Sequence, residues 1–201
     1  MPRKSWLAFA ALVLMPAAAN GHEAIPGVTG FASQLLHPLV DTEQLFLLVS
    51  AAMIAGRMAR GSIWSAMFAL VAGMLAGKGL HMLVPWLPLV WYAPLLLLAI
   101  SGLVLAGFSR IAAIPGLGLI AASGAVIAIA IVPDEPTGMS LASALTGTLV
   151  SGTVLLLVGG YALQQVQSRW GGIALRIAGA WLAAIAMLNL ALVWKTLAGA
   201  G

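Results

Sequence analysis

An imidazole and a carboxylate stand four residues apart in the stretch that runs from His37 to Gln44. Pro38 fits the first position of a helix, and His37 and Asp41 then lie near one face at its mouth. Glu43 adds a second carboxylate. Imidazole with carboxylate suits a hard or borderline divalent ion such as Ni(II), Co(II) or Zn(II). The stretch is therefore a candidate metal site, and the alternative is a set of solvated polar groups that begin a helix.

Lys78 and His81 lie in an otherwise apolar stretch, where the lysine has a glycine on either side. An ammonium inside a membrane span is costly, so it should face the protein interior or a wet cavity and find a partner there. By depth we expect Asp41 or Glu43 to be that partner, and Lys78 to act as a gating charge. The alternatives are a lysine that extends toward the headgroups without function, and an interfacial His81 that is not a metal ligand.

Two further carboxylates, Asp134 and Glu135, are adjacent in a turn bounded by Pro133 and Pro136. Ordinary turn chemistry explains these residue types without any function. If they have a function, Asp134 and Glu135 are carboxylates of an outer loop, and their negative charge attracts cations.

The composition shows which kind of protein must position these groups. The chain has 201 residues, of which 62% are hydrophobic and 7% are charged, and its mean hydropathy is +1.09. Soluble globular domains have about 25% charged residues. The absence of cysteine excludes disulfides and thiolate metal sites, and the nine basic residues are too scattered to bind nucleic acid. We therefore predict an all-α, polytopic membrane protein that spans the lipid bilayer.

Residues 1–21 have the layout of a secretory signal peptide, with two basic residues, a short apolar run and small residues at the cleavage-determining positions. Cleavage would leave residues 22–40 as an extracytoplasmic N-terminal segment and residues 41–201 as a six-span transmembrane domain. The alternative is an uncleaved first helix. Apolar runs between turn signals predict spans at 41–55, 63–84, 88–108, 111–132, 141–163 and 173–194.

An N-terminus outside a bacterial inner membrane places most basic residues in the cytoplasm, as the positive-inside rule requires. Lys195 is an exception. The same orientation places all carboxylates and histidines at the outer face: His22, Glu23, His37, Asp41, Glu43, His81, Asp134 and Glu135. The alternative is that the clustering has no function, because the positive-inside rule does not restrict acidic residues at the outer face.

The chain resembles the HupE/UreJ family of hydrogenase and urease accessory membrane proteins. The likeness rests on the leader followed at once by His22, on Gly30-Phe31 leading to His37-Pro38, on Ala72-Gly73-Met74, and on Arg176-Ile-Ala-Gly179. The resemblance implies a protein of six or seven spans that acts as a nickel or cobalt permease.

The family signature is His-Pro, two residues, Gly, one residue, then Asp-His. Here Asp41 replaces the Gly, Glu43 replaces the Asp, and Gln44 replaces the second His. The chain also lacks the histidines that the family carries at the end of the fourth span and in the fifth span. The resemblance thus implies either an ion bound mainly by oxygen ligands or a loss of transport.

Three functions fit these observations. The first is a divalent metal ion permease of the nickel or cobalt type, without a permanent cofactor, in which His22, His37 and His81 help to dehydrate the ion. The second is a non-transporting subunit of a larger membrane complex, and small residues also permit a homo-oligomer. The third, a metal-dependent membrane hydrolase, has the weakest support because its ligand set is incomplete, and we expect no enzyme.

Overall fold

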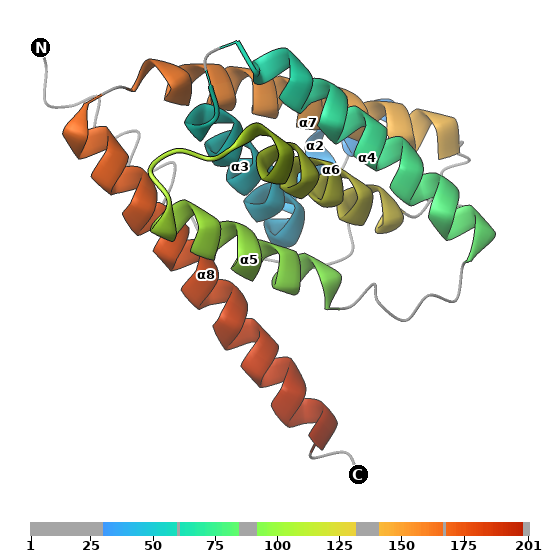
Figure 1. Ribbon diagram of the computed structural model, residues 1–201. Coiled ribbons are helices and arrows are strands. Elements are labelled where there is room, and N and C mark those ends of the chain that lie inside the picture. Colours follow the sequence, from blue (N-terminus) through green and yellow to red (C-terminus); the bar gives the residue numbers. More distant parts are fainter. Residues whose placement is uncertain (1–29, 60, 85–91, 132–140, 167, 199–201) are drawn as a thin grey trace, which may run out of the picture.

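The computed structural model describes residues 30–59, 61–84, 92–131, 141–166 and 168–198. All regular elements in these ranges are α-helices (Figure 1). They are α2 (Gly30–Val40), α3 (Thr42–Arg57), α4 (Ile63–Leu83), α5 (Ala93–Gly107), α6 (Ala113–Ile129), α7 (Leu141–Gln165) and α8 (Arg169–Ala198). The predicted all-helical class is confirmed, and the apolar runs predicted α3 to α8 to within a few residues at most ends. The proposed leader, residues 1–21, lies outside the described residues.

The helix that carries the candidate metal site is broken. α2 and α3 meet at Asp41 with a bend of 75°. Asp41 is extended, with φ −73° and ψ 113°, and its side chain caps α3 by accepting a hydrogen bond from the backbone N–H of Gln44. A short polar side chain in this conformation satisfies one of the free N–H groups that begin a helix.

The prediction that Pro38 opens the helix is wrong, and residues 22–40 include a helix that we did not predict. Pro38 lies inside α2, near its C-terminal end. Proline is disfavoured in a helix interior because it has no N–H to donate. α2 ends two residues after Pro38, so the proline precedes the break instead of starting α3.

Small residues bring α4 and α6 together. Gly73 and Gly77 lie one turn apart on α4 and face Ala121 and Ala125 of α6. A Cβ added at Gly73 would lie 2.7 Å from the carbonyl carbon of Ala121, so the two backbones are in direct contact. Lipid provides no hydrophobic force between helices, so close packing of this kind is a principal source of association.

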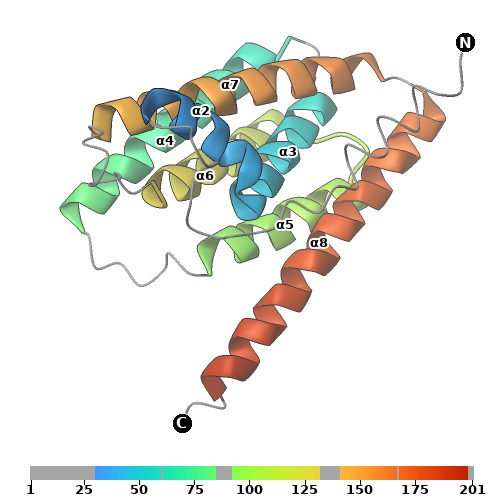
Figure 2. The same ribbon diagram turned by 180° about the vertical axis from the view of Figure 1, so that it is seen from behind.

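α5 and α8 pack in the same way, through Gly102 and Gly179. α8 then continues away from the other helices (Figures 1 and 2). It has 30 residues, or about 45 Å at the α-helical rise. Large apolar side chains of its second half are exposed, among them Leu188, Leu192 and Trp194, as expected for a surface that faces lipid.

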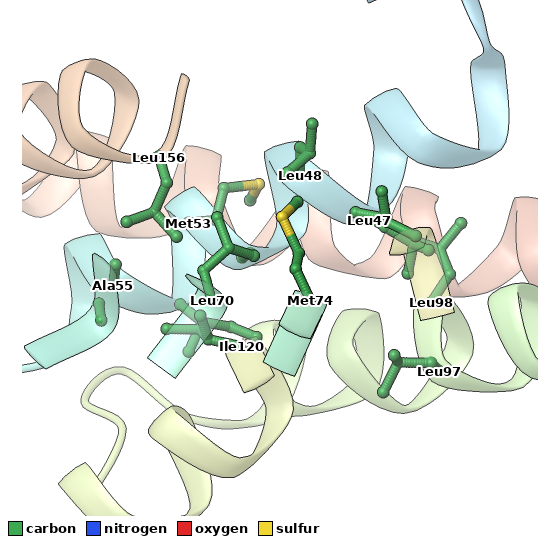
Figure 3. Close-up of a cluster of buried hydrophobic side chains, with 14 of the residues drawn as sticks. Leu47, Leu48, Met53, Ala55, Leu70, Met74, Leu97, Leu98, Ile120 and Leu156 are labelled. Atoms are coloured by element: carbon green, nitrogen blue, oxygen red, sulfur yellow. The ribbon is translucent and has the colours of Figure 1, made fainter. Parts of the chain in front are cut away.

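α3 is the central helix and lies between α5 and α7 in both views (Figures 1 and 2). Leu48 and Met53 of α3 pack with side chains of α4, α6 and α7 in the core (Figure 3). Leu48, Leu70, Met74, Ile120 and Leu156 are all 0% exposed. The helix that carries the candidate site is therefore held by neighbours on several sides.

Three helices, α4, α7 and α8, are long and apolar enough to cross a membrane, and α2 with α3 counts as a fourth if the bent pair is one span. α5 and α6 are apolar but shorter, with 15 and 17 residues. The chain is an integral, multi-pass membrane protein.

Candidate functional site

Three polar side chains meet at the bend between α2 and α3. Nε2 of Gln44 lies 3.4 Å from Nδ1 of His37 and donates to Oδ2 of Asp41 at 3.5 Å. The other oxygen of Asp41 accepts from the backbone N–H of Gln44 at 2.9 Å. The backbone N–H of Asp41 in turn donates to the carbonyl of His37. We call these three residues the bend cluster.

Gln44 is the most enclosed member of the bend cluster, at 5% exposure. Its Oε1 is buried and has no hydrogen-bond partner among the described residues. An unpaired buried oxygen is costly, so it usually marks a site for water, an ion or another donor. Sequence reasoning missed this role because it treated Gln44 only as the loss of an imidazole. No pattern in the sequence indicates that Gln44 reaches His37 across the bend at Asp41.

Glu43 does not join the bend cluster. It is exposed and lines a separate pocket of about 200 Å³ between α3, α5 and α8, to which Phe46 and Asn189 also contribute. Asp41 is the extended N-cap of α3 and its side chain turns to Gln44, whereas Glu43 lies in the first turn of α3 and lines the separate pocket. In the part of the chain that the structure describes, no three His, Asp or Glu side chains are grouped so that they could hold a metal ion.

Lys78 lies inside the protein, as expected, at 6% exposure. Its Nζ donates to the carbonyl of Ile131, two residues after the end of α6, at 2.6 Å. The expected pairing with Asp41 or Glu43 is not found among the described residues. The physical reason is that Lys78 follows Gly77 on the face of α4 that packs on α6, so a carbonyl at the end of α6 is within its reach.

His81 lies one turn after Lys78 and is half-buried. Its Nδ1 is buried and has no partner among the described atoms. The other predicted site residues, His22, Asp134 and Glu135, fall outside the described residues. The structure thus brings His37 and Asp41 together around Gln44, and places Glu43 elsewhere.

A comparison against family models matches most of the chain, including the residues of the bend cluster. The model described as HupE / UreJ protein matches residues 10–189. The chain belongs to the HupE/UreJ family. This family consists of membrane transporters and not of enzymes, so the expectation that the chain is no enzyme is confirmed. No curated protein and no solved structure matches the chain.

Gln44 contacts both His37 and Asp41 and is therefore the centre of the bend cluster. An amide oxygen is a harder ligand than an imidazole nitrogen. The cluster can therefore offer one nitrogen and several oxygen atoms to a cation.

Proposed function

We propose that the chain is a permease for a divalent metal ion of the nickel or cobalt type, and that the ion is first held at the bend cluster. The family to which the chain belongs is linked to nickel and cobalt uptake. The observation that carries the proposal is the buried amide of Gln44 at a break in a helix. Its Nε2 lies beside His37 and Asp41, and its Oε1 has no partner among the described residues.

The break itself supports this function. Transporters commonly bind ions at interrupted spans, where the C-terminal end of one half-helix presents free carbonyls to a cation. The end of α2 lies at the bend cluster. The start of α3 would repel a cation through its helix dipole, but Asp41 caps it and supplies a compensating negative charge.

Lys78 is the gating charge in this proposal. A fixed ammonium in the membrane opposes the passage of a divalent cation. Its hydrogen bond to Ile131 joins the end of α4 to the end of α6, so movement of these two helix ends would displace the charge. His81 is one turn away, its Nδ1 has no partner among the described atoms, and it serves as a second ligand along the same route.

The proposed permease has the membrane topology expected from the sequence. Six spans follow a removed leader in the bacterial inner membrane, and α2 with α3 forms the first of them. From the sequence we expect His22, Asp134 and Glu135 at the same outer face, where the acids would raise the local cation concentration. Glu43 acts in this way too, because it is exposed and does not face the cluster.

Uptake of radioactive nickel or cobalt by proteoliposomes that contain the purified chain tests the function. His37→Ala and Gln44→Ala should each lower the initial uptake rate at least about ten-fold, as expected for loss of one ligand worth about 1.4 kcal/mol. Gln165→Ala is the matched control, because Gln165 is an exposed glutamine at the far end of α7. No uptake by the wild-type chain would exclude the permease, and equal uptake rates in all four proteins would exclude the bend cluster as its metal site.

The second candidate function is a non-transporting subunit of a larger membrane complex. The observation that favours it is α8, whose second half extends from the helix bundle (Figure 2). Large apolar side chains of this half are exposed. Either lipid or a helix of a partner protein can cover this apolar surface. The uptake experiment separates the two functions, since a subunit without partners should transport no metal.

A further inference from the structure

The end of the bundle opposite the bend cluster contains a pocket lined by arginine. It has a volume of about 620 Å³ and lies where α3 and α5 end and α6 and α8 begin. Its lining includes Arg57, Ser109, Arg110, Ala112 and Ser168. We call it the arginine pocket, and nothing in the proposed metal transport uses it.

Arg57 is buried in the wall of this pocket, at 6% exposure. Its guanidinium donates to the carbonyl of Phe108 and, at 2.7 Å, to the carbonyl of Gly172. These bonds fix its position but supply no formal negative charge. A guanidinium has five N–H groups and cannot be deprotonated in a protein, so donors and a full positive charge remain.

Further positive charge lies close to Arg57. Arg110 lines the same pocket, and Nε of Arg176 donates to the carbonyl of Ala106, two residues before Phe108. The described carboxylates, Asp41 and Glu43, are at the other end of α3. The 16 residues of α3 separate the two ends by about 24 Å. Within the described residues no acid neutralises this group, and buried charge without a counter-charge is costly.

The start of α6 adds to the positive potential. Ala112 is its N-cap and provides no side-chain hydrogen bond, and Ala112 and Ala113 both line the pocket. The free N–H groups of a first helical turn and the helix dipole favour an anion.

We propose that the arginine pocket binds a phosphate group, carried either by the headgroup of an anionic phospholipid or by inorganic phosphate. Guanidinium groups match the geometry of phosphate oxygens, and hydroxyls such as those of Ser109 and Ser168 are suitable additional donors. A basic pocket between helices at the cytoplasmic edge of a membrane is a typical place for a phospholipid headgroup.

Binding to the full chain, purified in an uncharged detergent, tests the proposal. The probes are short-chain phosphatidylglycerol, short-chain phosphatidylcholine and inorganic phosphate, titrated by calorimetry at constant ionic strength. Arg110→Gln should weaken the binding of phosphatidylglycerol about ten-fold, as expected for loss of one charge-assisted hydrogen bond. Arg110→Lys should recover part of that loss, because it keeps the charge but not the planar guanidinium.

Arg169→Gln is the matched control, because Arg169 is exposed at the same end of the bundle but is not part of the pocket lining. Its binding constant should equal that of the wild type. Phosphatidylglycerol binding without phosphate binding identifies a lipid site, and binding of inorganic phosphate alone identifies a soluble ligand; both support the pocket. The proposal would be overturned if neither phosphatidylglycerol nor inorganic phosphate binds, or if phosphatidylcholine binds as tightly as phosphatidylglycerol. It would also be overturned if Arg169→Gln weakens phosphatidylglycerol binding as much as Arg110→Gln does.

Discussion

At the scale of single residues, an exchange of Gln44 tests the proposed metal site most directly. Its amide Nε2 lies within 3.5 Å of both Nδ1 of His37 and Oδ2 of Asp41. Gln44→His would place an imidazole between these two groups. Nickel and cobalt bind imidazole nitrogen better than an amide oxygen.

We therefore expect Gln44→His to bind Ni(II) at least about ten-fold more tightly than the wild type, a gain of about 1.4 kcal/mol. Equilibrium dialysis with the purified chain at a pH above 7 measures this, since the imidazole must be neutral to bind. Gln165→His is the control for a histidine added far from the cluster. Equal affinities in all three proteins would contradict a metal site at the bend.

The residue scale also shows what sequence reasoning could reach. His37 and Asp41 were singled out correctly as neighbours because four residues of chain fix their proximity in any helix or cap. The partner of Lys78 was wrong because it depends on which helix packs against α4. Ile131 is 53 residues away along the chain, and its carbonyl has no signature in a sequence.

At the scale of the helices, the apolar runs predicted α3 to α8 well because length and hydrophobicity are local properties. α2 was missed because its 11 residues include Pro38, and α2 joins α3 only through a bend at Asp41. The pairing of α4 with α6 and of α5 with α8 depends on contacts between distant glycines. A sequence indicates that such residues permit close packing, but it does not name the partner helix.

The contact of α4 with α6 gives a prediction on this scale. A side chain at Gly77 would place its Cβ 2.5 Å from Cα of Ala125, so Gly77→Val must separate the two backbones. We expect a loss of about 1–3 kcal/mol of stability, as for other overpacked interiors, and displacement of Lys78 from Ile131. Thermal unfolding in detergent measures the change.

Gly79 is the matched control for this substitution. It lies two residues further along α4, and an added Cβ there meets nothing within 4 Å. Gly79→Ala should keep the melting temperature or raise it, because alanine stabilises a helix relative to glycine by up to about 1 kcal/mol. A lower melting temperature for Gly79→Ala than for Gly77→Val would show that the glycine contact does not hold α4 to α6.

At the scale of the whole molecule, charge is divided between the two ends of the central helix. Asp41 and Glu43 lie at the start of α3, and Arg57 lies at its end beside Arg110. In the proposed topology, the metal site and the arginine pocket face opposite sides of the membrane. The positive-inside rule predicts that short connections rich in arginine stay in the cytoplasm. The arginine pocket is therefore expected on the cytoplasmic side and the metal site on the outer side.

Reporter fusions test this orientation. A fusion after Arg110 should give a fluorescent cytoplasmic reporter, and a fusion within residues 133–138 should give an active periplasmic phosphatase, because only the second connection lacks basic residues. A fusion after Arg169 is a second cytoplasmic control. The opposite pattern would place the bend cluster in the cytoplasm, where it could not receive an ion from outside. Uptake through this site would then be impossible in the proposed direction, whatever the affinity of the cluster for nickel.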